Sequence, residues 1–297
     1  MRTLRTVAEL RAAVSSGRAR GLSIGLVPTM GALHEGHLAL LSRAREECDL
    51  VVVSLFVNPS QFDEQADLER YPRDEARDAR LAADAGADVL FVPTPREVYP
   101  NGFATTVEVA GVSEPLEGRS RGAAHFRGVA TVVTKLLCMA LPDVAYFGRK
   151  DAQQLLVIRR LVADLNLPVR VAAVATVRET DGLALSSRNR LLSAGEREQA
   201  LGIPRALARA RERVDGGERS AAALLDCARG VLADHLLEVE YVALADPDTL
   251  APLSELDGEG LLLIAARAGR VRLIDNEIVG HLARQSIHEG EVATAVR

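Results

Sequence analysis

The chain has 297 residues, of which 48% are hydrophobic and 26% are charged, so it can form one large or two ordinary globular domains. Its formal net charge of −5 gives no electrostatic case for binding nucleic acid or an anionic membrane, and its apolar runs are too short to span a bilayer. The N-terminus lacks the apolar region of a signal peptide, and the three cysteines are odd in number and widely spaced. We therefore expect a cytoplasmic protein whose cysteines are small core residues.

Short apolar runs alternate with helical patterns over about the first 180 residues, which is typical of a parallel α/β sheet. The pattern predicts strands, in chain order, at 23–27, 50–56, 89–92, 106–109, 144–147 and 169–173. It predicts helices at 7–18, 36–48, 73–85, 128–140 and 151–165. Continuous apolar strands are buried on both faces, so a ligand is expected beyond their carboxyl ends.

The segment 178–190 breaks this alternation and is expected to be a loop between two domains. After it the pattern predicts helices at 194–214 and 220–237 and strands at 239–243, 261–266 and 271–274. We therefore predict a first domain over residues 1–177 and a small α+β domain over residues 178–297. The polar, aperiodic tail from about residue 281 is expected to be frayed.

The most informative segment is the run Val-Pro-Thr-Met-Gly-Ala-Leu-His-Glu-Gly-His over residues 27–37, where a predicted strand meets a predicted helix. A helix N-terminus attracts phosphate through its unpaired N–H groups and partial positive charge, and His34 and His37 can add donors to phosphate oxygens. Their spacing of three residues, with Gly36 between them, differs from the i, i+4 spacing of a zinc-protease helix and disfavours zinc. The other alternative is a pair of solvent-facing histidines in a loop.

Lysine is rare in this chain: only Lys135 and Lys150 occur among 36 basic residues. Lys150 follows an apolar segment, in the run Phe-Gly-Arg-Lys-Asp, where an α/β protein would contact a phosphate. A compact ammonium suits such a contact better than a planar guanidinium. Lys135 lies on a predicted amphipathic helix and is given no role.

Six segments of the chain resemble the motif set of the pantothenate synthetase (pantoate–β-alanine ligase) family. They are residues 28–37, Phe-Val-Asn-Pro-Ser-Gln-Phe over 56–62, Tyr-Pro-Arg over 71–73, His-Phe-Arg-Gly over 125–128, Phe-Gly-Arg-Lys-Asp-Ala-Gln-Gln over 147–154 and Asp-Gly-Leu-Ala-Leu-Ser-Ser-Arg-Asn over 181–189. The resemblance covers roughly residues 1–280, and six blocks together are far more specific than any one of them. It implies a Rossmann-like nucleotidyltransferase-type parallel-sheet domain with a smaller α+β C-terminal lid domain, related to class I aminoacyl-tRNA synthetases.

The resemblance implies an ATP-dependent condensation of (R)-pantoate with β-alanine to pantothenate through a pantoyl-adenylate, with release of AMP and pyrophosphate. It implies His37, His34 and Lys150 as catalytic residues, with His37 as the proton donor. Whether His37 transfers a proton or only stabilises charge is left open by the sequence. Mg²⁺ is expected to accompany ATP, with Asp78 as its candidate ligand.

The residues that the resemblance assigns to ATP come from three stretches of the chain. They are Met30, Gly31, His34 and His37, then Gly148, Arg149, Lys150 and Asp151, then Val177, Leu185, Ser186, Ser187 and Arg188. Gln61 and Gln154 are expected to bind pantoate, and Gln61 also β-alanine, because a neutral amide can both donate and accept. Asn58, Tyr71, His125 and Arg127 are further candidates for supporting the site. Arg149 stands where the family often has Glu, and Leu185 where Met is frequent.

The partners that we expect are ATP, pantoate and β-alanine, with no nucleic acid and no membrane. The resemblance also implies a homodimer joined through the N-terminal domain. Two alternatives remain open. One is a nucleotidyltransferase of the same fold that leaves the nucleotide on its product, and the other is a non-catalytic nucleotide-binding module.

Overall fold

The computed structural model describes residues 1–62, 68–69 and 71–280. The chain divides into two compact units between Ser193 and Ala194, which is later than the division expected between residues 177 and 178. The loop expected to join two domains therefore belongs to the first unit. The tail expected from about residue 281 lies outside the described residues.

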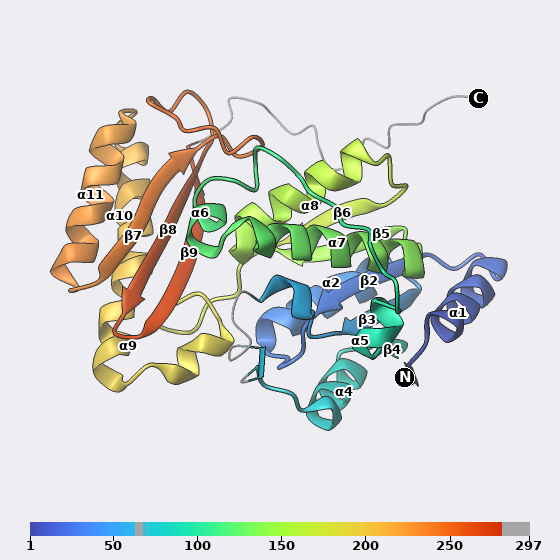
Figure 1. Ribbon diagram of the computed structural model, residues 1–297. Helices are drawn as coiled ribbons and strands as arrows, with labels where there is room; N and C mark the ends of the chain where they lie inside the picture. Colours follow the sequence, from blue (N-terminus) through green and yellow to red (C-terminus); the bar gives the residue numbers. More distant parts are fainter. Residues whose placement is uncertain (63–67, 70, 281–297) are drawn as a thin grey trace. The chain divides into compact units, whose positions relative to one another are not determined.

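The first unit is built around a six-stranded parallel sheet (Figure 1), as the alternating pattern predicts. The strands are β1 (Arg2–Leu4), β2 (Ile24–Thr29), β3 (Leu50–Leu55), β4 (Val89–Phe91), β5 (Val144–Gly148) and β6 (Arg170–Val174). Their order across the sheet is β1-β4-β3-β2-β5-β6, and all neighbouring pairs are parallel. Strands β3 and β4 follow β2 on one side of it, whereas the next two strands along the chain, β5 and β6, lie on its other side. The strand order therefore reverses between β2 and β5.

Helices cover both faces of this sheet. They are α1 (Val7–Ala19), α2 (Glu35–Glu47), α4 (Glu75–Asp84), α5 (Pro95–Val98), α6 (Glu117–Arg121), α7 (Ala123–Ala140) and α8 (Ala152–Asp164), with 3₁₀ helices η1 (Pro59–Gln61), η2 (Arg149–Asp151) and η3 (Ser187–Leu191). Helices α1, α7 and α8 pack in one core with Leu26 and Val52, whereas α2 and α4 pack in another with Val27 and Val53. The two cores use alternate strand residues because successive side chains point to opposite faces.

Burial on both faces explains why the central strands β2, β3 and β5 are nearly continuous apolar runs. All six residues of β3 are buried. Each fully buried Val or Leu contributes about 1.5–3 kcal/mol relative to an exposed one. Strands β2 and β5 are neighbours, but the helices that follow them, α2 and α8, lie on opposite faces of the sheet. The loops that leave these two strands therefore diverge at the carboxyl edge of the sheet.

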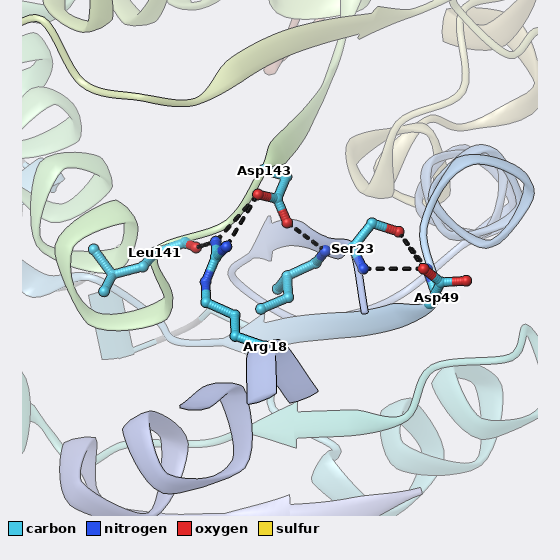
Figure 2. A network of polar contacts seen from close by, with 6 residues as sticks. Arg18, Ser23, Asp49, Leu141 and Asp143 are labelled. Carbon is cyan, nitrogen blue, oxygen red and sulfur yellow. Dashed lines mark hydrogen bonds and ion pairs between the residues drawn. The ribbon is translucent and has the colours of Figure 1, made fainter. Parts of the chain in front are cut away.

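The opposite, amino edge of the sheet is fixed by a polar network (Figure 2). The Asp143 carboxylate accepts the Ile24 N–H at 2.7 Å and the Arg18 guanidinium at 3.2 Å, and Arg18 also donates to the Leu141 carbonyl. The Asp49 carboxylate accepts both the N–H and the hydroxyl of the residue that precedes β2, at 3.0 and 2.7 Å. These contacts tie together the starts of β2, β3 and β5, the three strands whose far ends carry the predicted site.

The second unit contains an antiparallel sheet in the order β7-β8-β9 with helices packed against it (Figure 1). Its elements are α9 (Ala194–Ala200), α10 (Gly202–Asp215), α11 (Ala221–Asp234), β7 (Glu238–Ala245), β8 (Gly260–Ala268) and β9 (Val271–Val279). The single helix predicted over 194–214 is therefore two helices. Within the described part of the chain, the helices are all too short or too polar to cross a membrane.

Two further predictions about local structure are wrong, and one strand was not predicted. The predicted strand at 106–109 is not a strand: the Val107 N–H donates to the hydroxyl of Thr131 on α7 at 3.0 Å instead of to a sheet neighbour. Strand β1 is absent from the predicted elements, because it is only three residues long and Leu4 is its one buried residue. Of the cysteines expected in the core, only Cys48 is buried, whereas Cys138 is exposed and Cys227 is half-buried.

Candidate active site

The two histidines lie at the N-terminus of α2, directly after the turn that follows β2. His34 is the N-cap residue, and its Nδ1 accepts the Gly36 N–H at 3.2 Å. The Nδ1 of His37, three residues further on, accepts the His34 N–H at 3.3 Å. The two imidazoles therefore cap the helix reciprocally, as Ser and Glu do in a capping box, and their ring centroids are 4.2 Å apart.

These contacts fix the tautomer of both rings. A backbone N–H can only donate, so Nδ1 of His34 and of His37 must be unprotonated, and the proton of the neutral ring lies on Nε2. Burial is the main cause that lowers the pKa of His37 to about 3; the neighbouring His34 and Lys150 act in the same direction, and the charge of Asp151 opposes them. Burial, followed by the charge of Lys150, also lowers the pKa of His34. At neutral pH the site therefore presents two uncharged Nε2–H donors.

Gly36 leaves room for the His34 ring between the two histidines. A Cβ atom at this position would lie 3.0 Å from Cε1 and Nδ1 of the His34 ring, which is tighter than an ordinary contact. The same position is 3.7 Å from Cδ2 of Leu185, so the loop after β6 reaches the histidine turn. Sequence position alone does not indicate this approach, because Leu185 is far from Gly36 along the chain.

Lys150 follows β5, the strand that pairs with β2. It lies in the 3₁₀ helix η2, its side chain is 21% exposed, and its Nζ is 3.6 Å from Oδ1 of Asp151. Burial is the main cause of the lowered pKa values of His34 and His37, and the positive charge of Lys150 contributes to both. The structure thus brings together the two histidines and the lysine that the sequence places after separate strands.

The remaining residues assigned to this stretch differ in exposure. Gly148 ends β5 and is half-buried, whereas Arg149 and Asp151 are exposed. Gln154 is half-buried in the first turn of α8. Its neighbour Gln153 has a structural role instead, since its buried amide accepts the Glu117 N–H at 3.0 Å and donates to two carbonyl groups of the segment before α6.

The loop after β6 supplies basic groups near the histidines. Ser186 caps η3 by accepting the Arg188 N–H at 3.3 Å. The positive charge of Arg190 contributes to lowering the pKa of His34. Burial raises the pKa of Tyr71, and the charge of Arg188 opposes that rise, which places Arg188 within electrostatic range of Tyr71.

Other residues of this loop hold its shape. The carbonyl of Val177, one of the residues assigned to ATP, accepts the Leu185 N–H at 2.9 Å. The side chain of Asn189 is buried, and its Nδ2 donates to Glu179 at 2.5 Å and to the Ala184 carbonyl at 3.1 Å. Ser187, the first residue of η3, is half-buried.

Gln61 ends the 3₁₀ helix η1, and its orientation is determined by Asn58. The backbone N–H of Ser60 donates to Oδ1 of Asn58 at 3.3 Å, and Nδ2 of Asn58 donates to the Gly128 carbonyl at 3.1 Å. Since a backbone N–H cannot accept and a carbonyl cannot donate, the Asn58 amide has one possible orientation. Its Nδ2 also donates to Oε1 of Gln61 at 3.0 Å.

The Gln61 amide is therefore oriented with Oε1 toward Asn58. Its Nε2 faces Met30, whose thioether sulfur accepts at 2.9 Å. Sulfur is a weak acceptor, so a carboxylate or hydroxyl oxygen of a substrate would replace it favourably. The backbone carbonyl of Gln61 also contacts Nδ1 of His125 at 3.0 Å. Tyr99 has no role in the sequence analysis, yet its hydroxyl donates to Oδ1 of Asn58 at 2.8 Å.

Asp78 does not have the environment of a magnesium ligand. It lies on α4, its side chain is 1% exposed, and its two carboxylate oxygens accept the N–H groups of Ala32 and Leu33, each at 2.8 Å. Among residues 1–62, 68–69 and 71–280, no group of three or more His, Cys, Asp or Glu side chains could hold a metal ion. The prediction that Asp78 binds magnesium therefore does not fit the contacts that this carboxylate makes.

Comparisons with known proteins show the family to which this chain belongs. Residues 2–278 match the family model described as pantoate-beta-alanine ligase. A pantothenate synthetase of Cereibacter sphaeroides is 58% identical over 273 residues, covering 92% of this chain and 98% of that protein. The pantothenate synthetase of Heliobacterium modesticaldum is 54% identical and covers 94% and 99%.

Solved structures agree as well. A crystal structure of pantothenate synthetase from Thermus thermophilus has a TM-score of 0.88 at 49% identity and covers 93% of this chain and 99% of that one. The pantoate-beta-alanine ligase of Francisella tularensis, complexed with beta-gamma ATP and beta-alanine, has a TM-score of 0.76 at 33% identity and covers 94% and 97%. The predicted nucleotidyltransferase-type fold is confirmed by these neighbours. The chain therefore belongs to the pantoate-beta-alanine ligase family and is a ligase that forms a carbon–nitrogen bond.

Proposed function

We propose that this ligase condenses (R)-pantoate with β-alanine in two steps, through a pantoyl-adenylate, and releases pyrophosphate and then AMP. The observation that carries this proposal is the pair of neutral Nε2–H donors on His34 and His37, which lie at a helix N-terminus within electrostatic range of Lys150. A helix N-terminus, two further donors and an ammonium together suit the oxygens of a triphosphate.

In the first step a pantoate carboxylate oxygen attacks the α-phosphorus of ATP, and the bond from that phosphorus to the bridging oxygen breaks. Pyrophosphate leaves with the bonding electrons, and no proton needs to move. Charge develops on phosphate oxygens, so catalysis requires positioning and electrostatic stabilisation rather than an acid. Neutral imidazoles with low pKa values fit this requirement, which favours charge stabilisation over proton transfer as the role of His37.

Lys150 would bind the β- and γ-phosphates as a point charge, and the basic loop after β6 would add to this charge. Ser186, Ser187 and Arg188 are the candidates from that loop, and the charge of Arg190 acts on His34 in support of this placement. A loop of this kind could close on the triphosphate and open for pyrophosphate. The lid role that the resemblance implies for the C-terminal domain stays a prediction.

The second step requires the neutral amine of β-alanine close to the acyl carbon of the adenylate. The amine nitrogen attacks, the bond from the carbonyl carbon to the phosphate oxygen breaks, AMP leaves, and the nitrogen loses a proton. Gln61 and Gln154 would orient pantoate. The Nε2 of Gln61 would donate to a substrate oxygen, because Oε1 is already held by Asn58.

We propose that Mg²⁺ enters as the complex with ATP, held mainly by phosphate oxygens, as magnesium usually is in nucleotide sites. Asp78 does not fit as its ligand, since both carboxylate oxygens accept backbone N–H groups. No step of the mechanism is therefore assigned to this ion.

The test is mass-spectrometric detection of pantoyl-adenylate when β-alanine is withheld, followed by assay of AMP release when it is added. The proposal predicts accumulation of the adenylate in the first mixture and stoichiometric AMP and pantothenate in the second. AMP retained on the product would indicate a nucleotidyltransferase of the same fold. ATP binding without either product would indicate a nucleotide-binding module.

A homodimer and a cytoplasmic location belong to the same proposal. The three cysteines are free thiols, which agrees with a reducing compartment. Light scattering coupled to size-exclusion chromatography tests the dimer, because a mass near 31.8 kDa would show a monomer.

A further inference from the structure

The turn between β2 and the histidines has an unusual backbone. Gly31 has a φ of 94° and Ala32 a φ of 52°, so two successive residues lie in the left-handed region. A Cβ at Gly31 would be 2.9 Å from Cδ1 of Leu55 and would be strained at this φ in any case. Ala32 has a Cβ, so its left-handed conformation must be stabilised by contacts from outside the turn.

Side chains from other segments supply these contacts. The Gly31 N–H donates to the hydroxyl of Thr29 at 3.3 Å, and the next two N–H groups, of Ala32 and Leu33, donate to the two oxygens of Asp78. On the same helix as Asp78, Nη1 of Arg77 donates to the Leu33 carbonyl at 3.0 Å. Three consecutive N–H groups of the turn therefore have side-chain acceptors.

We propose that Asp78 is a positioning residue, which holds the turn from Met30 to Leu33 so that His34 begins α2 with both imidazoles correctly capped. The carboxylate is almost fully buried and acts through the backbone of the turn, not on substrate or metal. The inference rests on the proposed function for its catalytic consequence, but the contacts of the turn can be measured without any turnover.

The geometry makes Asp specific at this position. Each of its oxygens accepts one N–H, and the two N–H groups belong to adjacent residues. Asparagine has the same size but only one acceptor oxygen, so Asp78→Asn turns an NH₂ group toward a backbone N–H. The buried donor is then unsatisfied, and the turn must shift.

A matched control lies four residues earlier on the chain. The carboxylate of Asp74 caps the same helix by accepting the Arg77 N–H at 3.0 Å, so its acceptor role lies within α4 and not in the turn. Asp74→Ala therefore weakens α4 and leaves both acceptors of the turn in place. A fall in kcat that is common to both variants would reflect the stability of α4. A fall in kcat that is confined to Asp78→Asn would reflect the geometry of the turn.

The experiment measures five quantities on the full-length wild-type chain and on both variants: kcat, KM for ATP, the Mg²⁺ concentration for half-maximal rate, the ¹⁵N chemical shifts of the histidine ring nitrogens, and the melting temperature. We expect Asp78→Asn to lower kcat about 10²-fold, since a misplacement of about 1 Å can cost this much. The half-saturating Mg²⁺ concentration should change less than twofold, and the Nδ1 resonances of His34 and His37 should move. Asp74→Ala should lower the melting temperature and leave kcat within about threefold.

Two results would overturn the proposal. One is an Asp78→Asn enzyme whose rate is restored by excess Mg²⁺, because this would make Asp78 a metal ligand. The other is an unchanged kcat with unchanged histidine resonances. Should Asp78→Asn fail to fold, hydrogen exchange on the wild-type protein decides instead. Protected N–H groups at Ala32 and Leu33 support the proposal, and rapid exchange at both contradicts it. The histidine shifts and the exchange rates are read without substrate, so they test the turn even if the adenylate is never detected.

Discussion

Nδ2 of Asn58 donates a hydrogen bond to Oε1 of Gln61 at 3.0 Å, and this contact decides that Nε2 is the end of the Gln61 amide that faces Met30. The Asn58 amide is itself oriented by two backbone groups, the Ser60 N–H and the Gly128 carbonyl. Because Oε1 of Gln61 is held by Asn58, the end of the Gln61 amide that faces away from Asn58 is its Nε2 donor. Such fixed polarity favours a substrate oxygen with lone pairs over a group that carries hydrogens.

The first prediction concerns this polarity. Asn58→Asp replaces the Nδ2 donor by an oxygen, so the Gln61 amide should reverse and present Oε1 to the substrate. We expect KM for pantoate to rise at least about tenfold, the loss of one hydrogen bond to a charged group, while KM for ATP stays within about twofold. Steady-state kinetics with each substrate varied in turn checks this.

Tyr99→Phe is the matched control for that prediction. It removes a hydroxyl that donates to Oδ1 of Asn58 but leaves the two backbone contacts that orient the amide. KM for pantoate should therefore change less than threefold. Equal effects of Asn58→Asp and Tyr99→Phe would mean that general packing, not amide orientation, matters at this position.

The second prediction separates charge stabilisation from proton transfer by His37. His37→Ala should lower kcat about 10²-fold or more, as the loss of one transition-state donor does. Glutamine is the usual capping-box residue at this helix position and can accept the His34 N–H while keeping an N–H donor. His37→Gln should therefore be at least about tenfold faster than His37→Ala. Equal rates for the two variants would instead support proton transfer by the imidazole.

The third prediction is a dependence of stability on pH. Burial lowers the pKa of His37 to about 3 from its usual 6.5, so below pH 6.5 the unfolded chain binds a proton that the folded chain does not. This residue therefore contributes nothing above pH 6.5 and destabilises the fold progressively as the pH falls toward 3.

Denaturant unfolding of the wild type and of His37→Gln at pH 7.5 and pH 5.0 measures this effect. Between these conditions the free energy of unfolding of the wild type should fall by about 2 kcal/mol more than that of the variant. The other titrating groups are shared, so their contributions cancel in the difference. A parallel loss in both proteins would show that His37 is charged in the folded state at pH 5.0.

The fourth prediction concerns Lys150. Lys150→Arg keeps the charge but replaces a compact ammonium by a planar fork, so we expect KM for ATP to rise about tenfold or kcat to fall by a similar factor. The thermal stability should change little, because the side chain is partly exposed. ATP kinetics like those of the wild type would remove Lys150 from the phosphate site.

Much of the fold can be predicted because burial leaves a local pattern. Nearly continuous apolar runs predict β2, β3 and β5, since strands buried on both faces carry apolar residues at almost every position. The segment 106–109 reads Thr-Val-Glu-Val and alternates polar and apolar residues as a strand would, but its Val107 N–H donates to Thr131 of α7. Such alternation indicates that one face is covered but does not identify the element that covers it. The short strand β1 has too few residues to carry a pattern.

The residue types of the site can also be read from the chain. The order of His34, His37 and Lys150 after apolar runs places them at one edge of a parallel sheet, since all strands of such a sheet end on the same side. Asp78 resembles a possible metal ligand in the sequence because an aspartate in a helix pattern gives no sign of its burial. Its partners are 45 and 46 residues away along the chain.

Local periodicity and contiguous motifs suffice to predict the parallel sheet, the helix that begins at the histidines and the family of the chain. They do not predict which nitrogen of each imidazole carries the proton, which end of the Gln61 amide faces Met30 or what the Asp78 carboxylate binds. These are properties of hydrogen-bond partners brought together from distant segments. A donor or acceptor acquires its direction only when packing has placed its partner.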